Sequence, residues 1–142
     1  MPHPTLDFKR AYLALRRALE YTVKPFGFTG GQFDVLQQLM HEQELEHREL
    51  QRRLAITSPT LTNVIDLLER NGHVVRHPSN HDARVTMIGM TDTARGVCYS
   101  KEFCDAGDAL VEKMFEGFRP QERETFLKLL GRVQSNLEQF VP

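Results

Sequence analysis

The stretch that decides the fold covers residues 47–90 and reads HRELQRRLAITSPTLTNVIDLLERNGHVVRHPSNHDARVTMIGM. Leucines at helical spacing in its first part predict a short helix from about His47 to Ala55. A second helix begins at Ser58-Pro59, because serine can cap a helix and proline fits its first position. It ends at Asn71-Gly72. Two short helices joined by a turn of about three residues form a helix-turn-helix.

The hydrophobic period changes after this second helix. Residues 73–77 are short and β-branched and precede a proline, and residues 85–90 also have the composition of a strand. The polar segment 79–84 lies between them. We therefore expect a two-stranded hairpin, a wing that directly follows the helix-turn-helix.

Amphipathic helices flank this unit on both sides. The first, Leu6 to Val23, carries one apolar stripe, and the next opens with the capping-box pattern Thr29-x-x-Gln32. Thr91-Asp92 caps a long helix that runs toward Gly117. Pro120 opens a last helix, with a heptad-like seam formed by Phe126, Leu130, Val133, Leu137 and Phe140. The first and last stripes indicate self-association, and the alternative is that both pack on the core of the monomer.

The predicted fold class is mainly α with a small β-hairpin: a winged helix-turn-helix whose N- and C-terminal helices form a dimerisation region. A chain of 142 residues is one ordinary domain. Within this single domain over residues 1–142, we place the winged-helix lobe at about 30–92. The dimerisation helices fall at about 5–24 and 93–140.

The charges of the chain nearly cancel. There are 18 lysines and arginines against 19 aspartates and glutamates, a formal net charge of −1, which excludes attachment to nucleic acid by bulk charge. No apolar run approaches the length of about eighteen residues that spans a membrane, so we expect no membrane partner. The N-terminal residues show no basic segment followed by an apolar core, and we expect the protein in the cytoplasm.

The second helix of the helix-turn-helix presents a polar face opposite its apolar stripe. Its short hydroxyl and amide groups suit base edges and phosphates, and its N-terminal amides suit a phosphate. A helix projected from such a unit normally enters the DNA major groove. The alternative is that these residues only cap and solvate a surface helix. The candidate DNA contacts are Ser58, Pro59, Thr60, Thr62, Asn63 and Arg70.

The tip of the wing carries the pair Asp82-x-Arg84. We expect Asp82 to support the wing by pairing with a basic neighbour. This leaves Arg84 to enter a narrow minor groove, where the negative potential is greatest.

These residues resemble the MarR (multiple antibiotic resistance regulator) family of winged-helix transcription regulators. The resemblance covers nearly the whole chain and rests on six motifs: Thr29-x-x-Gln32-Phe33-x-x-Leu36, Leu50-x-x-x-Leu54-x-Ile56, Ser58-Pro59-Thr60-Leu61-Thr62-Asn63, Leu68-Glu69-x-x-Gly72-x-Val74-x-Arg76, Asp82-x-Arg84 and Met90-Thr91-Asp92-x-Ala94. It implies a homodimer joined by the N- and C-terminal helices and bound to double-stranded DNA at an inverted-repeat operator. Such a protein usually represses, and a small molecule or an oxidant releases it. His47 departs from the pattern, because relatives usually have a Ser or Thr cap there.

The resemblance also implies an effector pocket between the DNA-binding lobe and the dimer helices, one that often admits aromatic acids. The candidate contacts combine aromatic and cationic groups in the first two helices, and they are Tyr12, Arg16, Tyr21 and His41. The alternative is that these side chains only pack or face solvent.

Other chemistries have less support. The histidines at 73, 77 and 81 are four apart, but in a strand neighbouring ones would be about 13 Å apart, too far to share zinc. Cys98 and Cys104 lie six apart on one predicted helix, so we expect two free packing thiols, the alternatives being a thiol sensor or an intersubunit bridge. No phosphate loop or nucleophile elbow indicates an enzyme, and we expect no cofactor or metal. The main alternative function is a winged-helix protein-interaction module without specific DNA binding.

The segment from Glu46 to Met90 holds six arginines against five acidic residues, and four of the six histidines. Histidines near DNA phosphates would add positive charge as they protonate. We therefore expect operator binding to be stronger at about pH 6 than at about pH 8.

Overall fold

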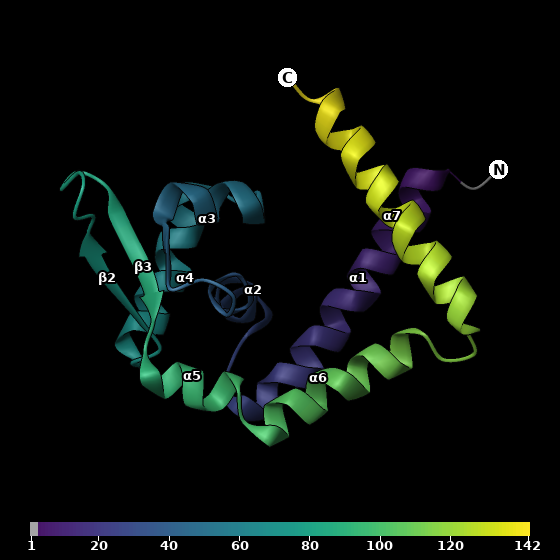
Figure 1. Cartoon of the computed structure of the whole chain (residues 1–142), viewed down its shortest axis with the longest axis horizontal. Coiled ribbons are helices and arrows are strands. Elements are labelled where there is room, and N and C mark those ends of the chain that lie inside the picture. The colour runs from purple at the N-terminus through teal and green to yellow at the C-terminus, as the bar shows by residue number, and fades with distance from the viewer. Residues whose placement is uncertain (1–2) are drawn as a thin grey trace. The chain divides into compact units, whose positions relative to one another are not determined.

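A computed structural model describes residues 3–142 and shows a mainly helical chain with a small antiparallel sheet (Figure 1). This confirms the predicted winged helix-turn-helix class. In chain order the elements are α1 (Pro4–Val23), the 3-10 turn η1 (Lys24–Phe26), α2 (Gly30–Leu39), β1 (Glu44–Glu46), α3 (His47–Leu54), α4 (Ser58–Arg70), β2 (Val74–Pro78), β3 (Thr86–Met90), α5 (Asp92–Cys98), α6 (Lys101–Met114) and α7 (Pro120–Phe140).

The start of α2 is fixed by the predicted capping box. The Thr29 hydroxyl accepts from the Gln32 backbone N–H at 3.1 Å, and the Gln32 side chain accepts from the Thr29 N–H at 3.0 Å. Gly30 then donates its N–H to the Glu20 carboxylate of α1 at 2.6 Å. A Cβ at position 30 would lie too close to that carboxylate, so a larger residue there would displace the Glu20 side chain and break this hydrogen bond.

The helix-turn-helix forms from α3 and α4, as predicted, but its cap is different. Thr57 has the extended backbone of an N-cap, and its hydroxyl accepts from the Thr60 N–H at 3.4 Å. The prediction that Ser58 caps α4 is therefore wrong, because Ser58 is already the first helical residue. Pro59 follows it within the first turn, where a missing N–H costs no intrahelical bond.

The sheet has three strands in the order β1-β3-β2, which corrects the prediction of a two-stranded hairpin. The hairpin itself is present, with Val75 of β2 opposite Gly89 of β3. On the other edge of β3, β1 pairs Leu45 with Ile88. A strand of three residues is too short to show alternation in sequence, so its pairing is decided by tertiary structure.

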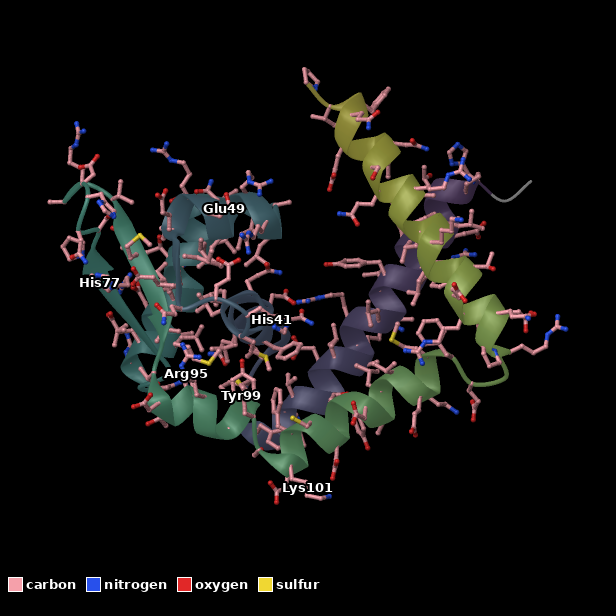
Figure 2. The ribbon with its side chains drawn as sticks, viewed as in Figure 1. His41, Glu49, His77, Arg95, Tyr99 and Lys101 are labelled. Carbon is pink, nitrogen blue, oxygen red and sulfur yellow. The ribbon has the colours of Figure 1, made fainter. Side chains whose placement is uncertain are left out.

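The long helix predicted from Asp92 toward Gly117 is broken in two. α5 ends at Cys98, and α6 begins at Lys101. The Ser100 hydroxyl accepts from the Phe103 N–H at 3.2 Å, and this side-chain bond supports a fresh helix start. The Tyr99 hydroxyl, at the break, donates to the Met40 carbonyl that follows α2 (Figure 2).

The break places the two cysteines on separate helices, not on one helix as the sequence reasoning assumed. Both are free thiols, with Cys98 buried and Cys104 exposed. Burial raises the pKa of the Cys98 thiol to about 11, so this thiol stays protonated and unreactive at neutral pH.

The chain divides into two compact units, one up to Gly107 and one from Asp108 onward. The first contains the buried core, to which the helices α1 to α6 and the sheet all contribute: Val23, Phe28, Val35, Leu36, Leu39, Leu45, Leu50, Leu61, Ile65, Leu68, Val74, Ile88, Met90, Ala94, Cys98 and Phe103. In the second unit, α7 buries no residue along its length. No helix within residues 3–142 is long and apolar enough to cross a membrane.

The neighbouring leucines of α4 test this core directly. Leu68 is fully buried and Leu67 is 45% exposed. We expect Leu68→Ala to lower the free energy of unfolding by about 2–5 kcal/mol, since it leaves a cavity. Leu67→Ala should change it by less than about 1 kcal/mol. Urea denaturation at one protein concentration checks both, and equal losses would contradict the assigned orientation of α4.

Candidate nucleic-acid interface

The orientation of α4 is set by its buried stripe of Leu61, Ile65 and Leu68. The opposite face, which holds the predicted DNA contacts, is turned toward solvent. Five of these six residues are exposed, and Thr62 is half-buried: Ser58, Pro59, Thr60, Thr62, Asn63 and Arg70. The apolar period thus leaves the polar face of α4 uncovered for a partner.

The hydroxyl and amide groups of this face differ in what they already bind. Thr60 shares a hydrogen bond of 2.8 Å with the capping residue Thr57, and Thr62 lies 3.3 Å from His47 Nε2. Within the described residues, the Ser58 and Asn63 side chains have no hydrogen-bond partner. These two groups are therefore the ones most available to DNA.

A concave surface joins α3, the first turns of α4 and the wing. It encloses about 490 Å³, and its lining is Glu46, His47, Arg48, Gln51, Ser58, Thr62, Arg76, Arg84, Val85 and Thr86. Of the predicted contacts, Ser58, Thr62 and Arg84 meet there. The other four, Pro59, Thr60, Asn63 and Arg70, do not line it.

At the wing tip, Asp82 and Arg84 form an ion pair with three hydrogen bonds. Asp82 accepts from the Arg84 backbone N–H at 3.0 Å, from Nε at 3.1 Å and from Nη2 at 3.2 Å. The basic partner of Asp82 is thus Arg84 itself, which corrects the prediction that Asp82 would pair elsewhere and leave Arg84 free. These bonds lower the pKa of Asp82. They orient the guanidinium, whose side chain is 91% exposed.

An ion-pair network connects the wing to α4. Arg76 of β2 donates from Nη2 to Asp66 at 2.6 Å and to Glu69 at 2.9 Å. These bonds raise the pKa of Arg76 and lower that of Glu69. Sequence reasoning did not assign a site role to Arg76. The sequence does contain a pattern that could have predicted this network: Asp66 and Glu69 are three residues apart and so share one face of a helix, and the strand that follows carries the basic residue Arg76.

Several charges of this lobe are already paired within it. Arg53 bonds Glu49 at 2.9 Å and Glu42 at 2.8 Å, and Glu49 carries a pKa lowered to about 2 by its arginine partners (Figure 2). Among the described residues, Arg48 and Arg70 have no ion pair. Arg48 also lines the concave surface, so it is a further candidate phosphate contact that the sequence reasoning missed.

The candidate effector contacts are not joined to one another. Arg16 donates to Asp34 at 2.7 Å, and burial raises the pKa of Asp34 in spite of that pairing. Tyr12, Tyr21 and His41 are exposed. Within residues 3–142, no hydrogen bond, ion pair or ring contact links any two of these four side chains.

The histidines of the lobe lie in different surroundings. The His73 and Phe28 ring centroids are 4.9 Å apart, and the buried His73 Nδ1 has no hydrogen-bond partner within residues 3–142. His77, on the wing sheet, contacts the Glu44 carboxylate of β1 (Figure 2). No group of three potential metal ligands occurs among the residues that the structure describes.

Comparison with known proteins supports one family. Residues 28–86 match the MarR family model. The uncharacterised HTH-type transcriptional regulator YkoM of Bacillus subtilis is 29% identical over 126 residues, which are 89% of this chain and 80% of YkoM.

Two solved structures share the fold. A mutant of MarR from E. coli in complex with operator DNA has a TM-score of 0.80 and 24% identity, with 89% of each chain covered. BpsR of Bordetella bronchiseptica, whose DNA binding is regulated by 6-hydroxynicotinic acid, has a TM-score of 0.80 and 21% identity, with 93% of each chain covered. The family-model match over residues 28–86, the sequence relatives and the shared fold together support the MarR family of winged helix-turn-helix transcription regulators.

Proposed function

We propose that the protein is a cytoplasmic repressor that binds an inverted-repeat operator as a homodimer and releases it when a small aromatic acid binds. The observation that carries the DNA-binding part is the concave surface that joins α3, α4 and the wing. It brings hydroxyl groups at a helix N-terminus together with exposed guanidinium groups, the combination that reads base edges and phosphates.

The groups of this surface have distinct proposed roles. α4 enters the major groove, where Ser58, Thr60, Thr62 and Asn63 meet base edges and phosphates. Pro59 lies in the same first turn and contributes apolar contact, while Arg70 binds a phosphate at the far end of α4. Arg84 enters the adjacent minor groove, oriented by Asp82.

The dimer has support from apolar surface that the single chain leaves exposed. On α1, Phe8 is 48% exposed and Leu13 is 52% exposed. On α7, Leu130 and Leu137 of the heptad-like seam are 40% and 59% exposed. Apolar stripes on long helices normally pack against a partner, and a second copy supplies the same stripes by symmetry. Two copies of α4 then reach successive major grooves, about 34–36 Å apart.

Replacing the wing arginine tests the minor-groove contact. Arg84→Ala should weaken operator binding by about 1–3 kcal/mol, because it removes the exposed guanidinium. Arg119→Ala is a matched control: Arg119 is also more than four-fifths exposed and pairs with a nearby acid, Glu122, but lies outside the lobe. Fluorescence anisotropy with a duplex selected from a random library measures both. Unchanged affinity in Arg84→Ala would show that the wing role is wrong.

A charge placed in the seam of α7 tests the dimer. Leu130→Glu should shift the protein from dimer to monomer in sedimentation equilibrium, because an unpaired carboxylate is costly in an apolar interface. Ser135→Glu adds the same charge to the opposite face of the same helix and should leave the dimer intact. If both variants sediment like the unmodified protein, the seam does not form the interface.

The effector proposal has support from BpsR, whose DNA binding is regulated by an aromatic acid, 6-hydroxynicotinic acid. Tyr12, Arg16, Tyr21 and His41 are the proposed contacts, with Arg16 as the cation for the carboxylate. A thermal-shift screen of small aromatic acids should yield a stabilising compound that also releases the selected duplex. The Arg16→Gln variant should lose both responses. A compound that stabilises this variant equally would remove Arg16 from the site.

A further inference from the structure

His47 occupies an unusual position at the edge of the concave surface. It is the first residue of α3, and its Nε2 lies 3.3 Å from the Thr62 hydroxyl of α4. Both side chains are half-buried, and both line the surface with Ser58 and Arg84. His47 therefore contacts Thr62, a proposed DNA contact, although His47 lies on α3 and Thr62 lies on α4.

The hydrogen bond between these two groups depends on the charge of the imidazole. A neutral imidazole has one N–H and one acceptor nitrogen, so the Thr62 hydroxyl can donate to His47 or accept from it. An imidazolium has two N–H groups and no acceptor, so Thr62 can only accept. The Thr62 hydrogen must then point to another acceptor, and phosphate oxygens and the guanine major-groove edge are acceptors.

The charges around His47 come from every element that borders it. Arg76 faces it from β2, and Arg84 lies across the surface on the wing. Glu46 and Arg48 are its neighbours in sequence. Arg76 pairs with the two α4 carboxylates Asp66 and Glu69, and Arg84 pairs with Asp82, so both of these positive charges have negative partners. α4 contributes Thr62 and Ser58, which carry no charge. Three arginines, Arg48, Arg76 and Arg84, therefore line the same concave surface as His47.

We propose that His47 is a positioning residue for DNA recognition: it takes up a proton when DNA occupies the concave surface, and its protonation turns the Thr62 hydrogen toward the DNA. The inference rests on the proposed function, because it requires DNA phosphates at this surface. It assigns the pH dependence of binding to His47 and not to the other three histidines of the lobe.

The direction of the effect follows from linkage. In the free protein, desolvation and the Arg76 charge lower the pKa of His47, so the imidazole is neutral at neutral pH. Phosphates next to the surface favour the imidazolium and raise that pKa. Affinity therefore increases as the pH falls from the bound-state pKa to the free-state pKa, by at most about tenfold per pH unit for each proton. Above both values, affinity does not depend on this group.

The other lobe histidines are separated from this effect by their contacts. His77 is held by the Pro78 carbonyl and the Glu44 carboxylate, which keep its pKa raised in the free protein. His73 packs against Phe28. His81 lies at the exposed wing tip and provides the most demanding control, since it is near the proposed minor-groove contact.

The test compares full-length protein with His47→Gln, His77→Gln and His81→Gln, using a duplex selected from a random library by the unmodified protein. The unmodified protein should bind about threefold to tenfold more tightly at about pH 6 than at about pH 8. His77→Gln and His81→Gln should keep that ratio. His47→Gln should bind with nearly the same affinity at both pH values, because glutamine does not titrate.

Calorimetry of the unmodified protein provides a measurement that does not depend on the folding of any variant. Binding enthalpies at about pH 6 in two buffers of different ionisation enthalpy give the number of protons taken up. Uptake by the unmodified protein that disappears in His47→Gln supports the inference. Specific binding without uptake, or an unchanged pH ratio in His47→Gln, overturns it and leaves DNA binding intact. Failure to select any preferred duplex overturns the proposed function, and this inference with it.

Discussion

The concave surface between α3, α4 and the wing depends on one ion-pair network, in which Arg76 of the wing strand donates to Asp66 and Glu69 of α4. Single ion pairs at a surface contribute little to stability. The importance of this network lies in geometry and charge. It links the wing to α4, and its one guanidinium pairs with two carboxylates on a helix that is proposed to lie against phosphates. Without it, the same helix would present unpaired negative charge to DNA.

Ion pairing within the lobe is also consistent with the net charge of −1 of the chain. Four of the five acids between Glu46 and Met90 are bound by arginines inside the lobe, and the fifth, Glu46, lines the concave surface. Arg48 and Arg70 have no ion pair among the described residues, and the Arg84 side chain is almost fully exposed. The lobe thus carries little total charge, and in the proposed complex it would bind DNA through a few placed guanidinium groups and through shape complementarity.

Features that are set by interactions between residues close in sequence were predicted correctly. The Thr29 capping box, the buried stripe of α4 and the hairpin all follow from short-range spacing, and the structure confirms them. Features set by tertiary contact were missed or misplaced. β1 is held by its pairing with β3, which sequence alone does not reveal. The break before α6 lies at Ser100, whose hydroxyl accepts from the Phe103 N–H, but the apolar residues on both sides keep a continuous helical spacing. The partners of Arg76 and His47 come from other elements, so their roles required coordinates.

The most direct test of this account is the affinity of charge variants of the network for a selected duplex. Arg76→Gln should weaken binding by about tenfold, because it leaves Asp66 and Glu69 unpaired. Adding Asp66→Asn and Glu69→Gln to that variant should restore most of the lost affinity, because the repulsive charges are gone. If Arg76→Gln binds like the unmodified protein, or if the triple variant stays as weak as Arg76→Gln, the network does not control the concave surface.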